Sequence, residues 1–278
     1  MFRTIYLGKL QGAKIYIHWS FWILAIFVFL SGLSQGVSHA LSLLGFLFAI
    51  FGCVFLHELG HAVAAKAFGK KTHDITLLPI GGVARIEGGN MSAIAEGWVA
   101  IAGPAVNFVI ALALLLGAWI SGSVIRFDVD PDQVVKLNAA QQLIAANLVL
   151  AIFNLLPAFP LDGGRLLRSV MCYWLERPVA LRLAARIGQW TSGLLLLSSI
   201  FWWNGMGILF AIILFLINTF QRFQAQLTIS ASEGAIFESA WPPDSRFDES
   251  NHFDDSKTID AVEVREVSSS STRRSLGP

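Results

Sequence analysis

The chain has 278 residues, of which 55% are hydrophobic and 14% are charged, and its formal net charge is +1. Soluble domains carry about 25% charged residues, so this composition excludes an ordinary soluble domain. The near-neutral charge gives no case for nucleic-acid binding. Two cysteines far apart in the sequence predict neither a disulfide framework nor a cysteine metal site. We therefore expect an all-α polytopic membrane protein in contact with a lipid bilayer.

Apolar segments of membrane-spanning length, about 20 residues each, follow one another along the chain. The first begins after Arg3, Lys9 and Lys14 and is longer than the apolar core of a signal peptide. We expect it to be retained as a span. About six transmembrane helices are predicted, at residues 17–33, 41–68, 94–120, 143–158, 187–203 and 206–220.

Lysine and arginine residues set the expected orientation, because cytoplasmic loops carry an excess of them. One side of the membrane receives only Arg126 and Lys136, in the loop before the fourth span. The other side receives the remaining basic residues near the spans: Arg3, Lys9, Lys14, Lys66, Lys70, Lys71, Arg85, Arg165, Arg168, Arg177, Arg182, Arg186 and Arg222. We therefore expect a multi-pass protein of the cell membrane with both termini in the cytoplasm.

Residues 74–87, between the second and third spans, contain two β-prone runs on either side of Gly81-Gly82. This pattern is typical of a β-hairpin. A small membrane-associated hairpin here would offer an edge that could pair with an extended peptide. A simple connecting loop is the other interpretation of the same residues.

The second span contains the sequence His57-Glu58-Leu59-Gly60-His61. Residues four apart share one face of a helix, so the two histidines can present two nitrogens to one metal ion. The pattern is typical of zinc hydrolases in which the glutamate acts as general base. Two histidines and a glutamate buried in lipid without a metal would be costly, which favours a metal site.

A catalytic zinc site needs a third protein ligand, for which Asp162 is the leading candidate. It follows Pro157 and Pro160, which end the fourth span, and precedes Gly163-Gly164, which permits close backbone approach. A broken helix end at membrane depth is tolerated where it is buried in protein or lines a wet cavity. The alternative role for Asp162 is the N-cap of a helix over residues 163–175.

Together, the histidine motif and the sequence Asn-Leu-Leu-Pro-Ala-Phe-Pro-Leu-Asp-Gly-Gly at residues 154–164 resemble the site-2 protease family of intramembrane zinc metalloproteases. The resemblance covers residues 15–222. It is strongest to the compact bacterial and archaeal branch that includes the sporulation processing protease. Residues 103–107 and Gly81-Gly82 also resemble features of that family.

The resemblance implies one zinc ion per chain, held by His57, His61 and Asp162, with Glu58 as the general base. Asn154 matches an asparagine of the family motif, which implies that it holds the substrate peptide or stabilises an oxyanion. A hydrogen bond from Asn154 to nearby backbone is the other interpretation.

We expect residues 1–226 to form the membrane-embedded metalloprotease domain and residues 227–278 to form a polar, disordered tail. This tail is too short and polar for the pair of CBS motifs found in many members of the compact branch. The implied activity is hydrolysis of peptide bonds in or near transmembrane segments of membrane-protein substrates. A metal transporter, or an inactive relative that binds membrane proteins as a scaffold, is the alternative function.

Overall fold

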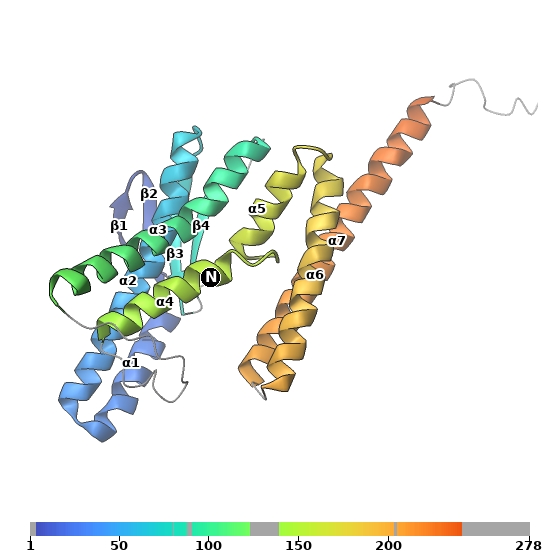
Figure 1. The fold of residues 1–278 in the computed structure, drawn as a ribbon. Coiled ribbons are helices and arrows are strands. Elements are labelled where there is room, and N and C mark those ends of the chain that lie inside the picture. The colour runs from blue at the N-terminus through green and yellow to red at the C-terminus, as the bar shows by residue number, and fades with distance from the viewer. Residues whose placement is uncertain (1–3, 80, 88–90, 123–138, 203–204, 241–278) are drawn as a thin grey trace, which may run out of the picture. The chain divides into compact units, whose positions relative to one another are not determined.

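The computed structural model describes residues 4–79, 81–87, 91–122, 139–202 and 205–240. These residues are mainly helical, with one small β-sheet (Figure 1). Contacts within the chain divide it into two units, Met1–Ile229 and Ser230–Pro278. The loop that contains Arg126 and Lys136, and residues 241–278 of the expected tail, lie outside the described residues.

The sheet has four strands, where the sequence indicated only a two-stranded hairpin. The strands, in their spatial order, are β1 (Thr4–Leu10), β2 (Ala13–His18), β3 (Thr72–Leu78) and β4 (Gly81–Ile86). The pairs β1-β2 and β3-β4 are antiparallel, and β2 runs parallel to β3. Strand β4 is therefore an edge strand.

Residues 4–18 correct the sequence prediction, which placed Ile17 at the start of a membrane span and described the fold as all-α apart from one hairpin. Ile15 and Ile17 lie in β2, where their register partners are Ile75 and Leu77 of β3. Polar and apolar residues alternate along β2, which is the period of a strand with two different faces. The buried Ile75 packs with Ala62 of the second helix, so the sheet lies beside the C-terminal half of that helix (Figure 1).

Seven α-helices and one short 3₁₀-helix are present in the described part of the chain. They are α1 (Ser20–Gly32), η1 (Leu33–Gln35), α2 (Val37–Ala67), α3 (Ala93–Ile120), α4 (Ala139–Asn154), α5 (Asp162–Met171), α6 (Arg177–Phe201) and α7 (Gly205–Ala240). Among the described residues, three helical segments are long and apolar enough to cross a membrane: Val37–Ala67, Ala93–Ile120 and Gly205–Ala231. Two shorter apolar segments are Ser20–Gln35 and Ala139–Asn154. The count of six spans stays a prediction.

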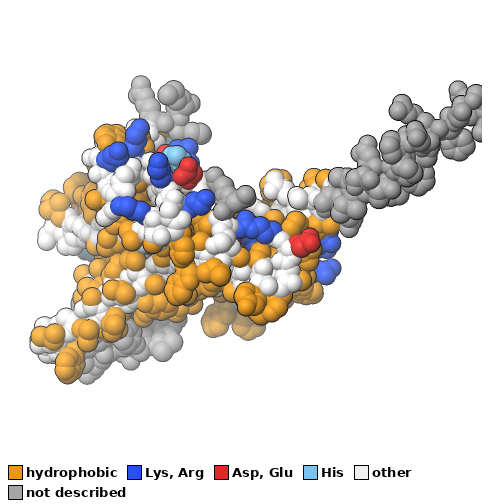
Figure 2. Space-filling view, turned by 90° about the horizontal axis from the view of Figure 1, so that it is seen from above, with side chains coloured by type: hydrophobic (Ala, Val, Ile, Leu, Met, Phe, Trp, Pro, Cys, Tyr) orange, Lys and Arg blue, Asp and Glu red, His pale blue; other side chains and the backbone are white. Residues whose placement is uncertain are grey.

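Large hydrophobic side chains are exposed along the helices, including Ile26, Val109 and Leu197, which are 58%, 65% and 66% exposed. Figure 2 shows hydrophobic side chains over much of one face, with lysine and arginine side chains gathered in separate areas. Apolar surface of this extent marks contact with a membrane or another protein. The basic side chains suit the polar boundary of a bilayer.

Small residues allow α2 and α3 to pack closely at the level of the histidine motif. A methyl group on Gly60 would lie 2.9 Å from the Ala102 carbonyl oxygen and 2.8 Å from the Val106 side chain. Gly60 therefore lets the backbones of α2 and α3 approach. This contact brings the histidines of α2 against the middle of α3.

Candidate metal centre

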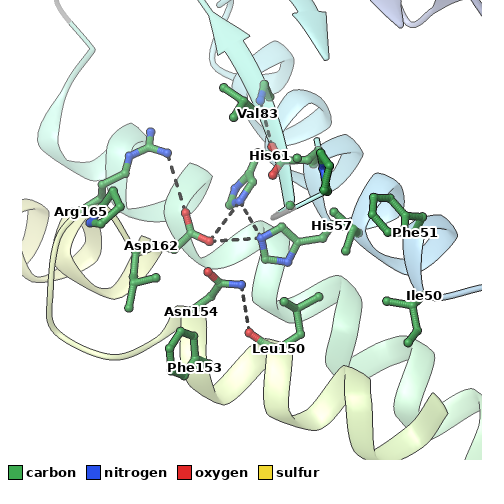
Figure 3. A pocket seen from close by; sticks show the side chains of 18 of the residues that line it. Ile50, Phe51, His57, His61, Val83, Leu150, Phe153, Asn154, Asp162 and Arg165 are labelled. Atoms are coloured by element: carbon green, nitrogen blue, oxygen red, sulfur yellow. Dashed lines mark hydrogen bonds and ion pairs between the residues drawn. The ribbon is translucent and has the colours of Figure 1, made fainter. Parts of the chain in front are cut away.

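His57, His61 and Asp162 lie together in the structure, as the sequence motifs indicated (Figure 3). Both histidines lie on one face of α2, and Asp162 is the first residue of α5. The Asp162 Oδ2 atom is 3.2 Å from Nε2 of each histidine, and the two Nε2 atoms are 3.1 Å apart. All three side chains are buried. Two ring nitrogens and one carboxylate oxygen therefore converge on one point.

The other nitrogen of each ring is held by α3. The Nδ1 atom of His61 is 2.6 Å from the Val99 carbonyl oxygen, and Nδ1 of His57 is 3.2 Å from Oδ1 of Asn107. A carbonyl oxygen only accepts, so Nδ1 of each ring carries a proton and donates it. In a neutral ring this leaves the Nε2 lone pair facing Asp162.

This protonation pattern fits a bound cation. Three hydrogen-bond acceptors, the two Nε2 atoms and the carboxylate, would otherwise face one another with no hydrogen between them. Two imidazoles and one carboxylate form a known ligand set for catalytic zinc, which keeps a further position open. Hydrogen bonds from Nδ1 to carbonyl oxygens are the usual support for histidine ligands of a metal. The donor set therefore fits zinc.

Gly103 of α3 has no side chain, which leaves room for the two histidine rings at their Nε2 atoms. A methyl group on this residue would lie 2.5 Å from Cε1 of His61 and 2.7 Å from Nε2 of His57. A side chain of any size at Gly103 would therefore displace the rings. The glycine is required by the close approach of α3 to the centre.

Glu58 lies in the same cavity but points to the sheet. Its Oε2 atom accepts a hydrogen bond from the Ala84 N–H of β4, at 3.0 Å. A methyl group on Gly82 would lie 3.0 Å from the Glu58 carboxyl carbon, so β4 passes close to this side chain. The carboxylate is therefore held beside the metal centre without being part of the three-atom cluster.

The cavity that contains these groups has a volume of about 650 Å³. Residues of α2, β4, α4, α5 and α7 line it, and most of the lining is apolar. Asn154, at the end of α4, is part of the lining and donates a hydrogen bond from Nδ2 to the Leu150 carbonyl oxygen, at 3.0 Å (Figure 3). One of its two N–H groups is therefore engaged by its own helix.

In the segment that carries Asp162, the backbone of one residue lies directly against the backbone of another. A methyl group on Gly164 would lie 2.7 Å from the carbonyl carbon of Ala158, which explains the need for glycine after the aspartate. The N-cap position of α5 is Leu161, and no side-chain capping hydrogen bond is present. The capping interpretation of Asp162 was therefore wrong. The Arg165 guanidinium lies 3.9 Å from Asp162 Oδ1 and forms an ion pair with this carboxylate.

The sequence did not reveal how α3 supports the histidines. The sequence singled out Asn107 only as part of residues 103–107, whereas its Oδ1 atom faces a ring of the metal centre. One signal was available, because Asn107 follows Gly103 by four residues and so lies on the same face of α3.

The model of peptidase family M50 matches residues 45–198 of the chain. This segment includes both histidines, Glu58, Asn154 and Asp162. The chain belongs to peptidase family M50. Membership confirms the resemblance drawn from the sequence motifs.

Two curated relatives and one solved structure agree with this result. A zinc metalloprotease of Methanocaldococcus jannaschii is 34% identical over 224 residues, which cover 80% of this chain and 60% of the relative. Stage IV sporulation protein FB of Bacillus subtilis is 34% identical over 155 residues, which cover 55% of this chain and 46% of the relative. The chain thus spans about half to three fifths of the length of these relatives.

The solved structure is the site-2 protease from Methanocaldococcus jannaschii. The match has a TM-score of 0.50 and 34% sequence identity, and it covers 81% of this chain and 94% of the other. The two chains therefore share a fold over most of the described residues.

Proposed function

We propose that this chain is a zinc-dependent intramembrane endopeptidase that cleaves membrane proteins in or near their transmembrane segments. The observation that carries the proposal is the buried convergence of His57, His61 and Asp162, with Glu58 in the same cavity. The two histidines and the glutamate lie on α2, which is long and apolar enough to cross a membrane. Membership of a peptidase family supports the same activity.

His57 Nε2, His61 Nε2 and a carboxylate oxygen of Asp162 would hold the zinc ion. When bound, zinc polarises the scissile carbonyl and makes water acidic enough to lose a proton near neutral pH. The Nδ1–H bonds to α3 keep both Nε2 lone pairs directed at the ion.

Glu58 is proposed as the general base. Its carboxylate would accept a proton from the attacking water and later deliver it to the leaving amine nitrogen. The Ala84 N–H of β4 holds one oxygen, Oε2, so the carboxylate stays beside the ligand cluster without joining it. Adjacent positions on a helix point in different directions, which separates the base on residue 58 from the ligand on residue 57.

Strand β4 is proposed to bind the substrate backbone. The Ala84 N–H donates to Glu58 and not to β3, so it lies on the free edge of the sheet. Backbone groups of Gly82 and Ile86, two residues away on either side, share that edge. A helical substrate hides its carbonyl groups in its own hydrogen bonds, and an extended one could pair with β4 by strand addition. Asn154, with one N–H group not used by Leu150, would contact the same peptide.

The proposed membrane arrangement has six spans, with both termini in the cytoplasm of a multi-pass protein. Residues 1–226 would form the protease domain and residues 227–278 a polar tail. The substrates would be membrane proteins with one or two spans. The distribution of basic residues supports this orientation, because lysines and arginines concentrate in the segments assigned to the cytoplasm.

The Glu58→Gln variant tests the proposal, with the full chain purified in detergent and reconstituted in liposomes with a membrane-protein substrate. We expect one zinc ion per chain to remain bound while cleavage is lost. A matched control is Glu176→Gln, a carboxamide substitution outside the cavity, which should cleave at the wild-type rate. Cleavage by Glu58→Gln at the wild-type rate would overturn the mechanism, and a wild-type chain that binds no zinc would overturn the proposed function. If the wild-type chain binds the substrate but does not cleave it, the alternative function of an inactive scaffold is favoured.

A further inference from the structure

The segment between α4 and α5 depends on a side chain of the last helix. Residues 155–161 carry the backbone from the end of α4 to Asp162. In the middle of this segment, the Phe159 N–H donates to Oδ1 of Asn218 at 3.0 Å, and Nδ2 of Asn218 donates to the Phe159 carbonyl oxygen at 2.8 Å. One amide side chain on α7 therefore binds both backbone groups of a residue three positions before Asp162.

This contact uses all the hydrogen-bonding capacity of Nδ2 in Asn218. The second N–H of Nδ2 donates to the Leu214 carbonyl oxygen, one turn earlier on α7, at 2.8 Å. The side chain has no exposed surface. Its orientation follows from chemistry, because a backbone N–H needs an acceptor and a carbonyl oxygen needs a donor.

Helix α6 leaves room for the amide. A methyl group on Gly188 would lie 2.6 Å from Cγ of Asn218 and 3.1 Å from Cα of Ala158. Gly188 therefore lets α6 pass over the contact between α7 and the 155–161 segment. Three parts of the chain that are far apart in sequence meet at this point.

The opposite end of α5 is held by a different helix. Ser169 Oγ donates to the Ala93 carbonyl oxygen at 2.6 Å, and Arg168 forms an ion pair with Glu96, both on α3. A helix of ten residues is too short to be stable by itself, so its position depends on such contacts. The Asn218 contact supplies the anchor on the side of Asp162.

We propose that Asn218 is a positioning residue that sets the place of the Asp162 carboxylate opposite the histidines. The inference rests on the proposed zinc site. Replacement of Asn218 by an apolar residue leaves the Phe159 N–H and C=O unpaired in a buried environment, and the segment must move to satisfy them. Movement of that segment shifts the third ligand, while both histidines stay anchored to α3.

The first test measures zinc affinity of the full chain in lipid nanodiscs by competition with a chelator. We expect Asn218→Leu to weaken zinc binding 10- to 100-fold, the usual effect of losing a group that orients a ligand. Thr219→Val is the matched control, because its hydroxyl bonds to Gln189 and the Phe215 carbonyl oxygen, away from the 155–161 segment. A role limited to folding would lower the unfolding temperature of Asn218→Leu without changing its zinc affinity, and that result overturns the proposal.

The second test needs no variant. Hydrogen exchange of the Phe159 amide is measured in the wild-type chain with zinc and after zinc removal. We expect protection in both states, because Asn218 holds the segment before the metal arrives. Loss of protection on zinc removal would show that the metal alone orders the segment and would overturn the proposal. A wild-type chain that binds no zinc would instead refute the proposed function.

Discussion

Gly103→Ala tests whether the space beside the histidines is needed for the metal. The added methyl carbon would lie 2.5 Å from Cε1 of His61 and 2.7 Å from Nε2 of His57, whereas ordinary contacts begin at 3.4 Å. The methyl carbon would lie closer still to Nε2 of His61, so the rings or α3 must move by at least about 0.9 Å. Ligand distances in metal sites tolerate deviations of about 0.2 Å. A displacement of about 1 Å at a reacting centre costs roughly 100-fold in rate.

We therefore expect Gly103→Ala to lower peptidase activity by about 100-fold and to weaken zinc binding by a comparable factor. The assay is cleavage of a membrane-protein substrate in liposomes, with zinc content measured on the same preparation. Gly117→Ala is the matched control, because it lies on the same helix and a methyl group there meets no atom within 4 Å. Activity of Gly103→Ala within twofold of Gly117→Ala would refute the reasoning.

Three further predictions concern the surroundings of the centre. Asn107→Leu removes the acceptor for His57 and should weaken zinc binding about 10- to 100-fold. It should also destabilise the chain by about 1–3 kcal/mol, because the buried Nδ1–H of His57 is left without a partner. Chelator competition and thermal unfolding check the two parts, and unchanged zinc affinity would contradict the first. Arg168→Met leaves the buried Glu96 unpaired and should destabilise the chain by about 3 kcal/mol in denaturant unfolding. Adding Glu96→Gln to that variant should restore part of the loss, and no restoration would show that the ion pair is not the cause. Chelation of zinc should lower the unfolding temperature. The lost stabilisation is about 2.7 kcal/mol if the free zinc concentration before chelation is 100 times the dissociation constant. An unchanged unfolding temperature would argue against a metal that binds only the folded chain.

Local chemistry made the metal centre predictable. The spacing of His57 and His61 places both rings on one helix face, and that relation depends only on helix geometry. Asp162 was predictable because a carboxylate between a proline-broken helix end and two glycines has few structural roles in a membrane. The structure brings the three residues together as expected.

The sheet and the supporting contacts depend on pairings between distant segments, which a local pattern does not contain. The β2 residues Ile15 and Ile17 continue directly into an apolar helix, so their alternation was hidden within a longer apolar run. Their partner strand β3 lies beyond two helices. The contact of Asn218 with Phe159 likewise joins positions 59 residues apart, and nothing in the sequence near either residue signals it.

The positions of the three metal-facing residues along the sequence also set the order in which the metal centre can assemble during synthesis. The two histidines leave the ribosome about 100 residues before Asp162, which is roughly 5–20 s at about 5–20 residues per second. Asn218 follows after another 50 or so residues. For that interval a nascent chain has the α2 histidines but lacks the third metal-facing residue and its anchor on α7. Under the proposed function, the metal site is therefore complete only after Asp162 has been made, and its proposed anchor is present only after Asn218 has followed.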